Sequence, residues 1–224
     1  MSYQLTRNEL IEAALRKLAV LAEGQTPSTQ NYADADKALN LIIAQYRALG
    51  MPLWARAEYT FTPTTGSYNI GSGQTLNTSF PVKMLQAYRT ETNTKIDMDI
   101  VPKEEFNILP NGSSGSPIKL SYQPYVNYGT IYLWPAPTST NTATITLVYT
   151  RPLSYTTLST DVLDMPEEWQ QAVVYALAVA LSPEWSIPLP DRQFLKQEAK
   201  EYLDNAASVG QDVGSFFVLP AREQ

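Results

Sequence analysis

An uncharged run of ten residues, Ala172 to Leu181, constrains this chain more than any other feature of its sequence. Asp164 can cap the first backbone N–H groups of a helix entered through Pro166, and Pro183 ends the helix because proline cannot continue it. A helix that is apolar on every side must be enclosed by protein or by lipid. Since a membrane span needs about 20 apolar residues, the run predicts a helix enclosed by other helices, with no membrane contact.

Composition excludes several kinds of active site. The 224 residues include no His and no Cys. Their absence removes disulfides, thiolate and imidazole metal ligands, and Ser-His or Cys-His nucleophiles. Residues 1–7 lack the basic and apolar regions of a signal peptide. We therefore expect no catalytic residue, no metal site and no cofactor.

Negative charge is concentrated at the end of the chain. Residues 1–56 carry six Lys and Arg against five Asp and Glu, and residues 57–163 carry six against seven. Residues 164–224 carry four against ten, which accounts for the net charge of −6. A protein that grips phosphates usually shows a basic stripe, and this sequence has none. The acidic part is either a solvated surface or a wall that repels nucleic acid passing nearby.

Amphipathic helices are expected at both ends of the chain. Thr6 and Glu9 fit a capping box, and apolar residues at helical spacing follow as far as Ala22. A second helix over 30–49 ends at a Gly and a Pro, so the first two helices should form an antiparallel hairpin. The apolar run and a helix over 191–207 would form another hairpin.

Between residues 53 and 163 the apolar periodicity changes to two, which predicts β-strands. Strands are expected at 58–62, 67–70, 83–90, 95–101, 118–122, 130–134 and 142–150. The last of these places Ala143, Ile145, Leu147 and Tyr149 on one face. Residues 103–109 are expected to form one short helix.

The predicted fold class is therefore α+β: a four-helix bundle made of two helical hairpins, with an inserted, mainly antiparallel β domain and an extended C-terminal tail. Residues 1–52 and 164–208 would form the two halves of the bundle. The insert would span residues 53–163 and the tail residues 209–224. The uncharged helix should lie at the centre, covered by one apolar stripe from each of the others.

Carboxylates in the β region are the first candidates for chemistry. Asp97 and Asp99 alternate on an expected strand and so share a face, and Glu104 and Glu105 follow closely. A glycosidase needs two carboxylates about 5–10 Å apart. A solvated strand face followed by an acidic helix start explains the same residues and is favoured. The glycine loops at 71–73 and 112–115 lack the spacing of a phosphate-binding loop and predict turns.

An aromatic cluster and an apolar tail are the candidates for binding. The cluster contains Tyr122, Tyr125, Tyr128, Tyr132 and Trp134. Its rings could stack on sugars or on bases, but without nearby Lys or Arg in the sequence a core or subunit interface is favoured. The tail contains Phe216, Phe217, Val218 and Leu219, which are too apolar for a solvated end. They either fold back onto their own bundle or bind a groove on a partner, and the residues alone do not decide between the two.

Several segments, in their order, resemble the head-to-tail adaptor proteins of short-tailed bacteriophages. That family includes proteins called tail accessory factors and packaged-DNA stabilisation proteins. The similar segments are residues 15–25, 38–50, 68–71, 129–137 and 164–178. None of them carries catalytic residues. The resemblance covers most of residues 5–205, and it implies that the C-terminal tail with Phe216, Phe217, Val218 and Leu219 binds the portal or a neighbouring copy.

The resemblance implies a structural protein of the virion, made in the host cytoplasm. About twelve copies would form a ring beneath the portal, extend the DNA channel, help retain the packaged DNA and offer an attachment platform to the tail. The implied partners are further copies of the chain, the portal protein, and tail nozzle or tail fibre proteins. Packaged double-stranded DNA would pass through without sequence-specific contact.

Two other functions stay open from the sequence. A glycan-binding or glycan-cleaving tail protein would use the aromatic cluster together with Asp97 and Asp99. A head-completion or tail-terminator ring of a long-tailed phage would have the same lack of catalytic residues.

Overall fold

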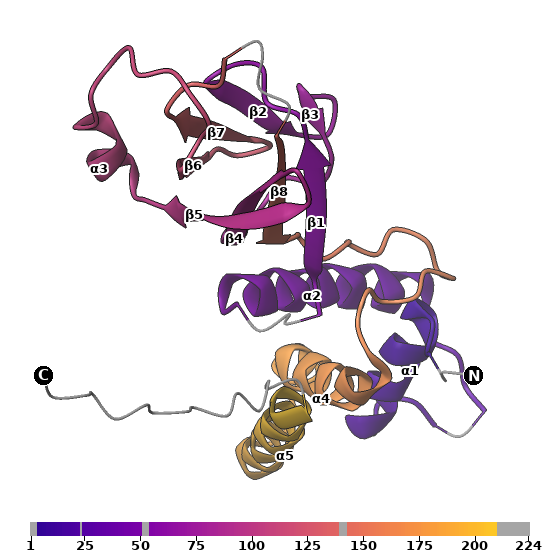
Figure 1. The fold of residues 1–224 in the computed structure, drawn as a ribbon. Helices are drawn as coiled ribbons and strands as arrows, with labels where there is room; N and C mark the ends of the chain where they lie inside the picture. The colour runs from indigo at the N-terminus through magenta and orange to yellow at the C-terminus, as the bar shows by residue number, and fades with distance from the viewer. Residues whose placement is uncertain (1–3, 23, 51–53, 139–142, 210–224) are drawn as a thin grey trace, which may run out of the picture. The chain divides into compact units, whose positions relative to one another are not determined.

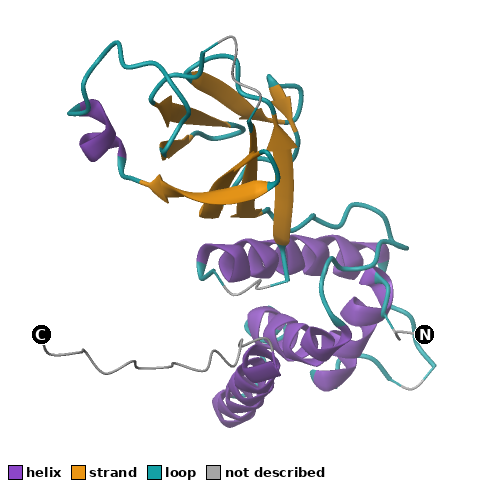
Figure 2. Cartoon of the chain, viewed as in Figure 1, coloured by secondary structure: helices purple, strands orange, loops and turns teal. Residues whose placement is uncertain are grey.

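The computed structural model describes residues 4–22, 24–50, 54–138 and 143–209, and the chain divides into two compact units (Figure 1). The helical unit comprises Met1–Trp54 and Ser154–Gln224, and the barrel unit comprises Ala55–Leu153. Figure 2 shows that the strands all belong to the barrel unit. The finer division of the chain at residues 52, 163 and 208 stays a prediction.

The first two helices of the helical unit are α1 (Arg7–Lys17) and α2 (Thr29–Ala48). The predicted capping box is confirmed: the Thr6 side chain accepts from the Glu9 backbone N–H, and the Glu9 carboxylate accepts from the Thr6 N–H. Helix α1 ends before the expected Ala22, because Ala19 adopts a left-handed backbone with φ 56°.

The uncharged run forms the helix α4 (Gln170–Leu181), which follows a short 3-10 helix, η1 (Glu167–Trp169). The predicted cap was wrong. Neither helix has a side-chain cap, and the Asp164 carboxylate accepts from the Ser154 backbone N–H instead. Eight residues of α4 are buried, so the expected enclosure by protein holds for most of the helix.

The prediction of a four-helix bundle was wrong. Helices α1, α2 and α5 (Leu189–Val209) each pack against α4, so α4 is central, but they do not close into a bundle of aligned neighbours. The physical reason lies in α5, where Leu195 and Ala206 are the only buried side chains among its described residues. Such a thin stripe covers α4 but cannot also pack on α1 and α2. The α+β protein is dominated by its β-sheet.

The described residues of the barrel unit form eight strands and the short helix α3 (Lys103–Asn107). The strands are β1 (Arg56–Phe61), β2 (Ser67–Gly71), β3 (Leu76–Asn77), β4 (Lys83–Glu91), β5 (Thr94–Ile100), β6 (Lys119–Pro124), β7 (Gly129–Trp134) and β8 (Thr144–Thr150). They form one sheet in the order β1-β8-β4-β5-β6-β7-β2-β3. The β2–β3 and β5–β6 pairs are parallel and the remaining pairs are antiparallel.

The sheet curls into a nearly closed barrel around one core (Figure 1). Phe61 of the edge strand β1 contacts Tyr68 of β2, with ring centroids 5.0 Å apart, so the two ends of the sheet approach each other. Strand β8 contributes Ile145, Leu147 and Tyr149 to the core, which confirms the predicted apolar face of this strand. A closed sheet protects its edges from pairing with other chains.

The two ends of the barrel unit meet. The backbone N–H of Arg151 donates to the carbonyl of Ala55 at 2.7 Å, directly beside the β1–β8 pair. The chain therefore enters and leaves the barrel at nearly the same point.

Candidate functional site

The connection from α4 to α5 is fixed by local hydrogen bonds. The Ser182 hydroxyl donates to the Val179 carbonyl at 2.8 Å, and the Ile187 N–H donates to the Ser182 carbonyl at 3.2 Å. Arg192 closes the turn by donating from Nε to the Ile187 carbonyl at 2.9 Å. A turn held by this many bonds presents its side chains in a defined arrangement.

Large apolar side chains are exposed around this turn. Leu189 and Phe194 are 62% and 63% exposed, and Trp185 is also exposed. Beside them lies a groove of about 490 Å³ lined by Leu18, Tyr175, Ile187, Pro188, Phe194 and Leu195. We name Trp185, Leu189, Phe194 and this groove the α4–α5 surface. Exposed apolar patches of this kind mark interaction sites on soluble proteins.

A second feature of the helical unit is the strap, residues 154–163, which leads back from the barrel unit to η1 and runs over α1 and α2. The Arg7 backbone N–H donates to the Asp161 carbonyl at 2.7 Å, and Arg7 Nη1 donates to the Thr157 carbonyl at 3.0 Å. Thr156 exchanges hydrogen bonds with Asn40 of α2. The strap is therefore held to both helices by polar contacts.

Two acidic side chains organise the strap. Asp161 accepts from the backbone N–H groups of Leu158 and Thr157 at 2.7 Å each, and these bonds lower the pKa of the Asp161 carboxyl. Asp36 of α2 forms an ion pair with Arg7, with Nη1 and Oδ1 3.2 Å apart. The side chains of Thr156 and Asp161 thus form hydrogen bonds within the helical unit, while some apolar side chains of the strap stay exposed.

The exposed apolar residues of the strap are Tyr155, Leu158 and Val162, of which Leu158 is 63% exposed. We name these three residues the strap surface. Tyr155 is oriented by Arg47, whose guanidinium lies 5.8 Å from its ring centroid. The helical unit therefore carries two apolar surfaces, which are built from different segments of the chain.

The aromatic cluster of the barrel unit is engaged in internal contacts. Tyr125 and Tyr128 stack on each other, with centroids 4.9 Å apart. Tyr122 packs against the core and donates its hydroxyl to the Pro81 carbonyl. Trp134 donates its indole N–H to the Pro110 carbonyl at 3.0 Å.

Tyr132 is covered as well. The Lys103 ammonium lies 3.1 Å from the centroid of its ring, and Phe106 of α3 packs beside it at 5.8 Å. Burial there lowers the pKa of Lys103. Each of the five aromatic residues thus contacts other groups of the barrel unit, while Tyr125 is still 43% exposed.

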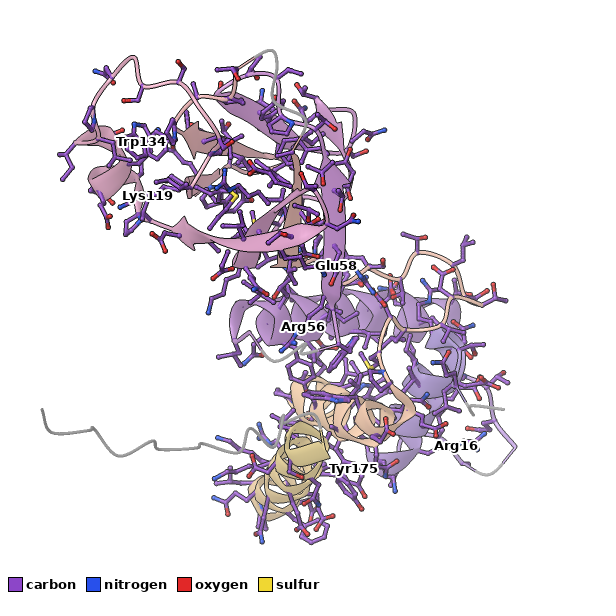
Figure 3. The ribbon with its side chains drawn as sticks, in the orientation of Figure 1. Arg16, Arg56, Glu58, Lys119, Trp134 and Tyr175 are labelled. Atoms are coloured by element: carbon purple, nitrogen blue, oxygen red, sulfur yellow. The ribbon has the colours of Figure 1, made fainter. Side chains whose placement is uncertain are left out.

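Two carboxylates of the β region are held by neighbouring polar side chains. Asp97 and Asp99 do share an exposed face of β5, as predicted, but Asp97 accepts from Gln86 at 3.2 Å. Glu105 pairs with Lys119, with Nζ and Oε1 3.0 Å apart. Lys119 lies opposite Trp134 in the β6–β7 register, beside α3, as Figure 3 shows. These acids are part of the surface of the barrel.

The predicted partner-binding residues Phe216, Phe217, Val218 and Leu219 lie outside the described residues. Sequence reasoning missed both surfaces of the helical unit. The α4–α5 surface left a signal, because Leu189 and Phe194 are large apolar residues at and just before the start of the predicted helix over 191–207. The strap surface left none, since isolated apolar residues in a loop are ordinary.

Within the described parts of the chain, no group of three or more acidic side chains is placed to hold a metal ion. Among the helices that the structure describes, none has the length and apolar character needed to cross a membrane. The family model described as SU10 adaptor protein matches residues 5–215. No curated protein matches the chain.

Proposed function

We propose a role in head-to-tail assembly for this chain, which belongs to the SU10 adaptor protein family and is a structural adaptor protein of a bacteriophage virion. Copies of the chain would form a ring beneath the portal. The ring would extend the DNA channel, help retain the packaged DNA and offer a platform to tail proteins.

The observation that carries this proposal is the pair of different apolar surfaces on the helical unit. A closed ring is built from heterologous contacts, in which one patch of each subunit binds a different patch of the next. The α4–α5 surface and the strap surface meet this requirement, because they come from different segments and both expose large apolar side chains. Copies that join the two surfaces would bury them together.

The charge of the chain supports passage of DNA without tight binding. In residues 164–208, the described part of the acidic segment, eight Asp and Glu face three Lys and Arg. A ring that carries this segment near its channel would repel phosphates and would not hold the duplex. Retention of the genome would then come from the narrowness of the assembled channel.

The tail residues Phe216 to Leu219 would supply a further contact, with the portal or a neighbouring copy. An apolar segment at the end of a chain gains order and buries surface when it binds a groove. Deletion of the residues after Gly210, followed by measurement of portal binding, tests this part. Unchanged affinity for the portal would remove it.

The ring itself is tested by changing the α4–α5 surface. We expect the double substitution Leu189→Ser and Phe194→Ser to leave the fold intact and to abolish ring formation, measured as particle mass by native mass spectrometry with and without the portal protein. Val126→Ser is the matched control, because Val126 is a highly exposed apolar residue of the barrel unit. Rings of unchanged mass in the double variant would refute the assigned surface. A wild-type protein that stays monomeric with portal would refute the ring.

A further inference from the structure

The enclosure of α4 is incomplete on one side. Ala176 and Val179 are only half-buried and Ala180 is exposed, although the residues around them are fully buried. These three positions are three and four residues apart, so they lie together on one face of the helix. The uncharged helix therefore still presents apolar surface after the whole described helical unit has packed around it.

That face forms the floor of a groove between α2, α4 and α5. The groove has a volume of about 340 Å³ and is lined by Ile42 and Tyr46 of α2, Val179 and Ala180 of α4, and Ala199 and Leu203 of α5. Lys196 and Lys200 contribute the positive charge at its border. Volumes of this order are typical of sites that hold apolar groups.

We infer that this groove holds residues Phe216 to Leu219 of the same chain in the free subunit. The inference concerns the subunit before assembly, and it deepens the proposed role of this segment, on which it rests. Four consecutive apolar residues match an apolar groove, and Asp212, which precedes them, is opposite in charge to Lys196 and Lys200.

Chain length permits this placement. Leu203 lies six residues before the end of α5 at Val209, a distance of about 9 Å along the helix. The seven residues from Val209 to Phe216 can span up to about 23–25 Å. Gly210 and Gly214 provide positions where the chain can reverse without steric cost. The segment can therefore return to the groove of its own subunit.

A contact within one chain also has an advantage in concentration. Linkage through a short segment gives an effective concentration of about 1 mM or more, which exceeds that of free subunits in dilute solution. The same contact would oppose assembly, because a segment held in its own groove is not available to the portal. Portal binding would then require release of the segment.

Disulfide trapping tests the placement, and the chain offers a clean background because it has no Cys. We expect the variant Ala180→Cys/Val218→Cys to form a disulfide within single chains under mild oxidation, at a rate that does not change on dilution. Ala33→Cys/Val218→Cys is the matched control, since Ala33 is an exposed residue of α2 that does not line the groove. Its disulfide should form at least about tenfold more slowly.

Limited proteolysis gives a second readout that needs no cysteine. Ala180→Arg places a bulky charge in the groove at an exposed position, so we expect the fold to survive and chymotrypsin to cleave after Phe216 or Phe217 faster than in the wild type. Equal disulfide rates in the two cysteine pairs, disulfides between chains that fade on dilution, or unchanged cleavage would each overturn the inference. These outcomes do not depend on portal, so they are distinct from a failure of the ring proposal.

Discussion

The Arg7 side chain is the main link between α1, α2 and the strap, so its removal is the sharpest test of how the strap is held. Arg7 Nη1 contacts both Asp36 Oδ1 at 3.2 Å and the Thr157 carbonyl at 3.0 Å. The side chains of Arg7 and Asp36 are only 14% and 25% exposed. Arg7→Ala would therefore leave a partly buried carboxylate without its cation.

The expected loss follows from these contacts. A hydrogen bond to a charged group contributes about 1.5–3 kcal/mol, and a partly buried ion pair exceeds the value of about 0–1 kcal/mol found at exposed sites. A second effect of the substitution is stabilising. Within the described residues, Arg7 Nε is buried without a hydrogen-bond partner, and removing this unsatisfied donor raises the free energy of unfolding by about 1 kcal/mol. We expect Arg7→Ala to lower the free energy of unfolding by about 2 kcal/mol.

Tryptophan fluorescence during urea unfolding can measure this loss in the helical unit alone. The chain has four Trp, of which Trp134 belongs to the barrel unit. In a Trp134→Phe background the remaining signal comes from the helical unit. The matched control is Arg16→Ala, because Arg16 is 59% exposed and lies 3.8 Å from Glu12 on the same helix. Its pair is worth about 0.3–0.5 kcal/mol.

The reasoning fails if the two Arg variants lose the same stability. It also fails if Arg7→Ala changes the midpoint by less than its control, since the strap would then be held by its backbone contacts alone. A changed slope of the unfolding curve would instead indicate an altered denatured state.

Two further predictions concern the buried Tyr46 and the partly buried Tyr122. Burial raises the pKa of Tyr46 to about 12, so the stabilisation from the neutral Tyr46 is complete below pH 10 and is lost as the pH rises toward 12. Tyr46→Phe should therefore reduce the decline of the free energy of unfolding in that range by about 1.4 kcal/mol per pH unit, measured by circular dichroism. An unchanged pH dependence in the variant would contradict this prediction. A Cβ at Gly129 would clash with the Tyr122 ring, so Gly129→Ala should destabilise the barrel by about 1–3 kcal/mol in thermal melts followed by circular dichroism. The control Gly66→Ala, with a 3.4 Å contact, should not. Equal melting temperatures of the two variants would contradict the prediction and show that Tyr122 can move.

Local features of the fold were predictable because their causes are local. The Thr6–Glu9 capping box depends on residues three positions apart, and the face of β8 that includes Ile145 depends on alternation. Strands were expected at 83–90 and 95–101, and between them Thr92 and Asn93 adopt the left-handed backbone that joins β4 to β5. In each case the deciding interactions lie within a few residues.

Tertiary contacts explain what the sequence could not predict. Asp164 is of a residue type that commonly caps helix N-termini, yet its carboxylate accepts a hydrogen bond from the Ser154 N–H of the strap. Parallel pairing of β5 with β6 and the approach of Phe61 to Tyr68 depend on segments far apart in the chain, so neither the sheet order nor the barrel closure follows from periodicity. The four-helix bundle was predicted from the apolar stripes of the helices alone. An apolar stripe shows that one side of a helix is buried, but it does not determine how many other helices pack against that side.

The candidate surfaces were predictable only in part. Large apolar residues near the start of the predicted helix over 191–207, such as Leu189 and Phe194, could have been recognised before the structure was known. The groove above Val179 and Ala180 could not, because three helices must meet before it exists. The interpretation of the aromatic cluster depended on Lys103, which lies far from Tyr132 in the sequence and directly over its ring in the structure.

The hydrogen bond between Arg151 and Ala55 has a consequence for the order in which the chain folds. Helix α4 must find α1 and α2 across an insertion of about 100 residues, and an open loop of that length costs about 3 kcal/mol more to close than a turn of a few residues. Once the barrel has formed, its two ends are one hydrogen bond apart, and the helical unit closes as if the insertion were a short turn. The cost of closing the helical unit then depends on the distance between the two ends of the folded barrel and not on the sequence inside it. The barrel unit can therefore diverge to suit different neighbours while the helical unit stays unchanged.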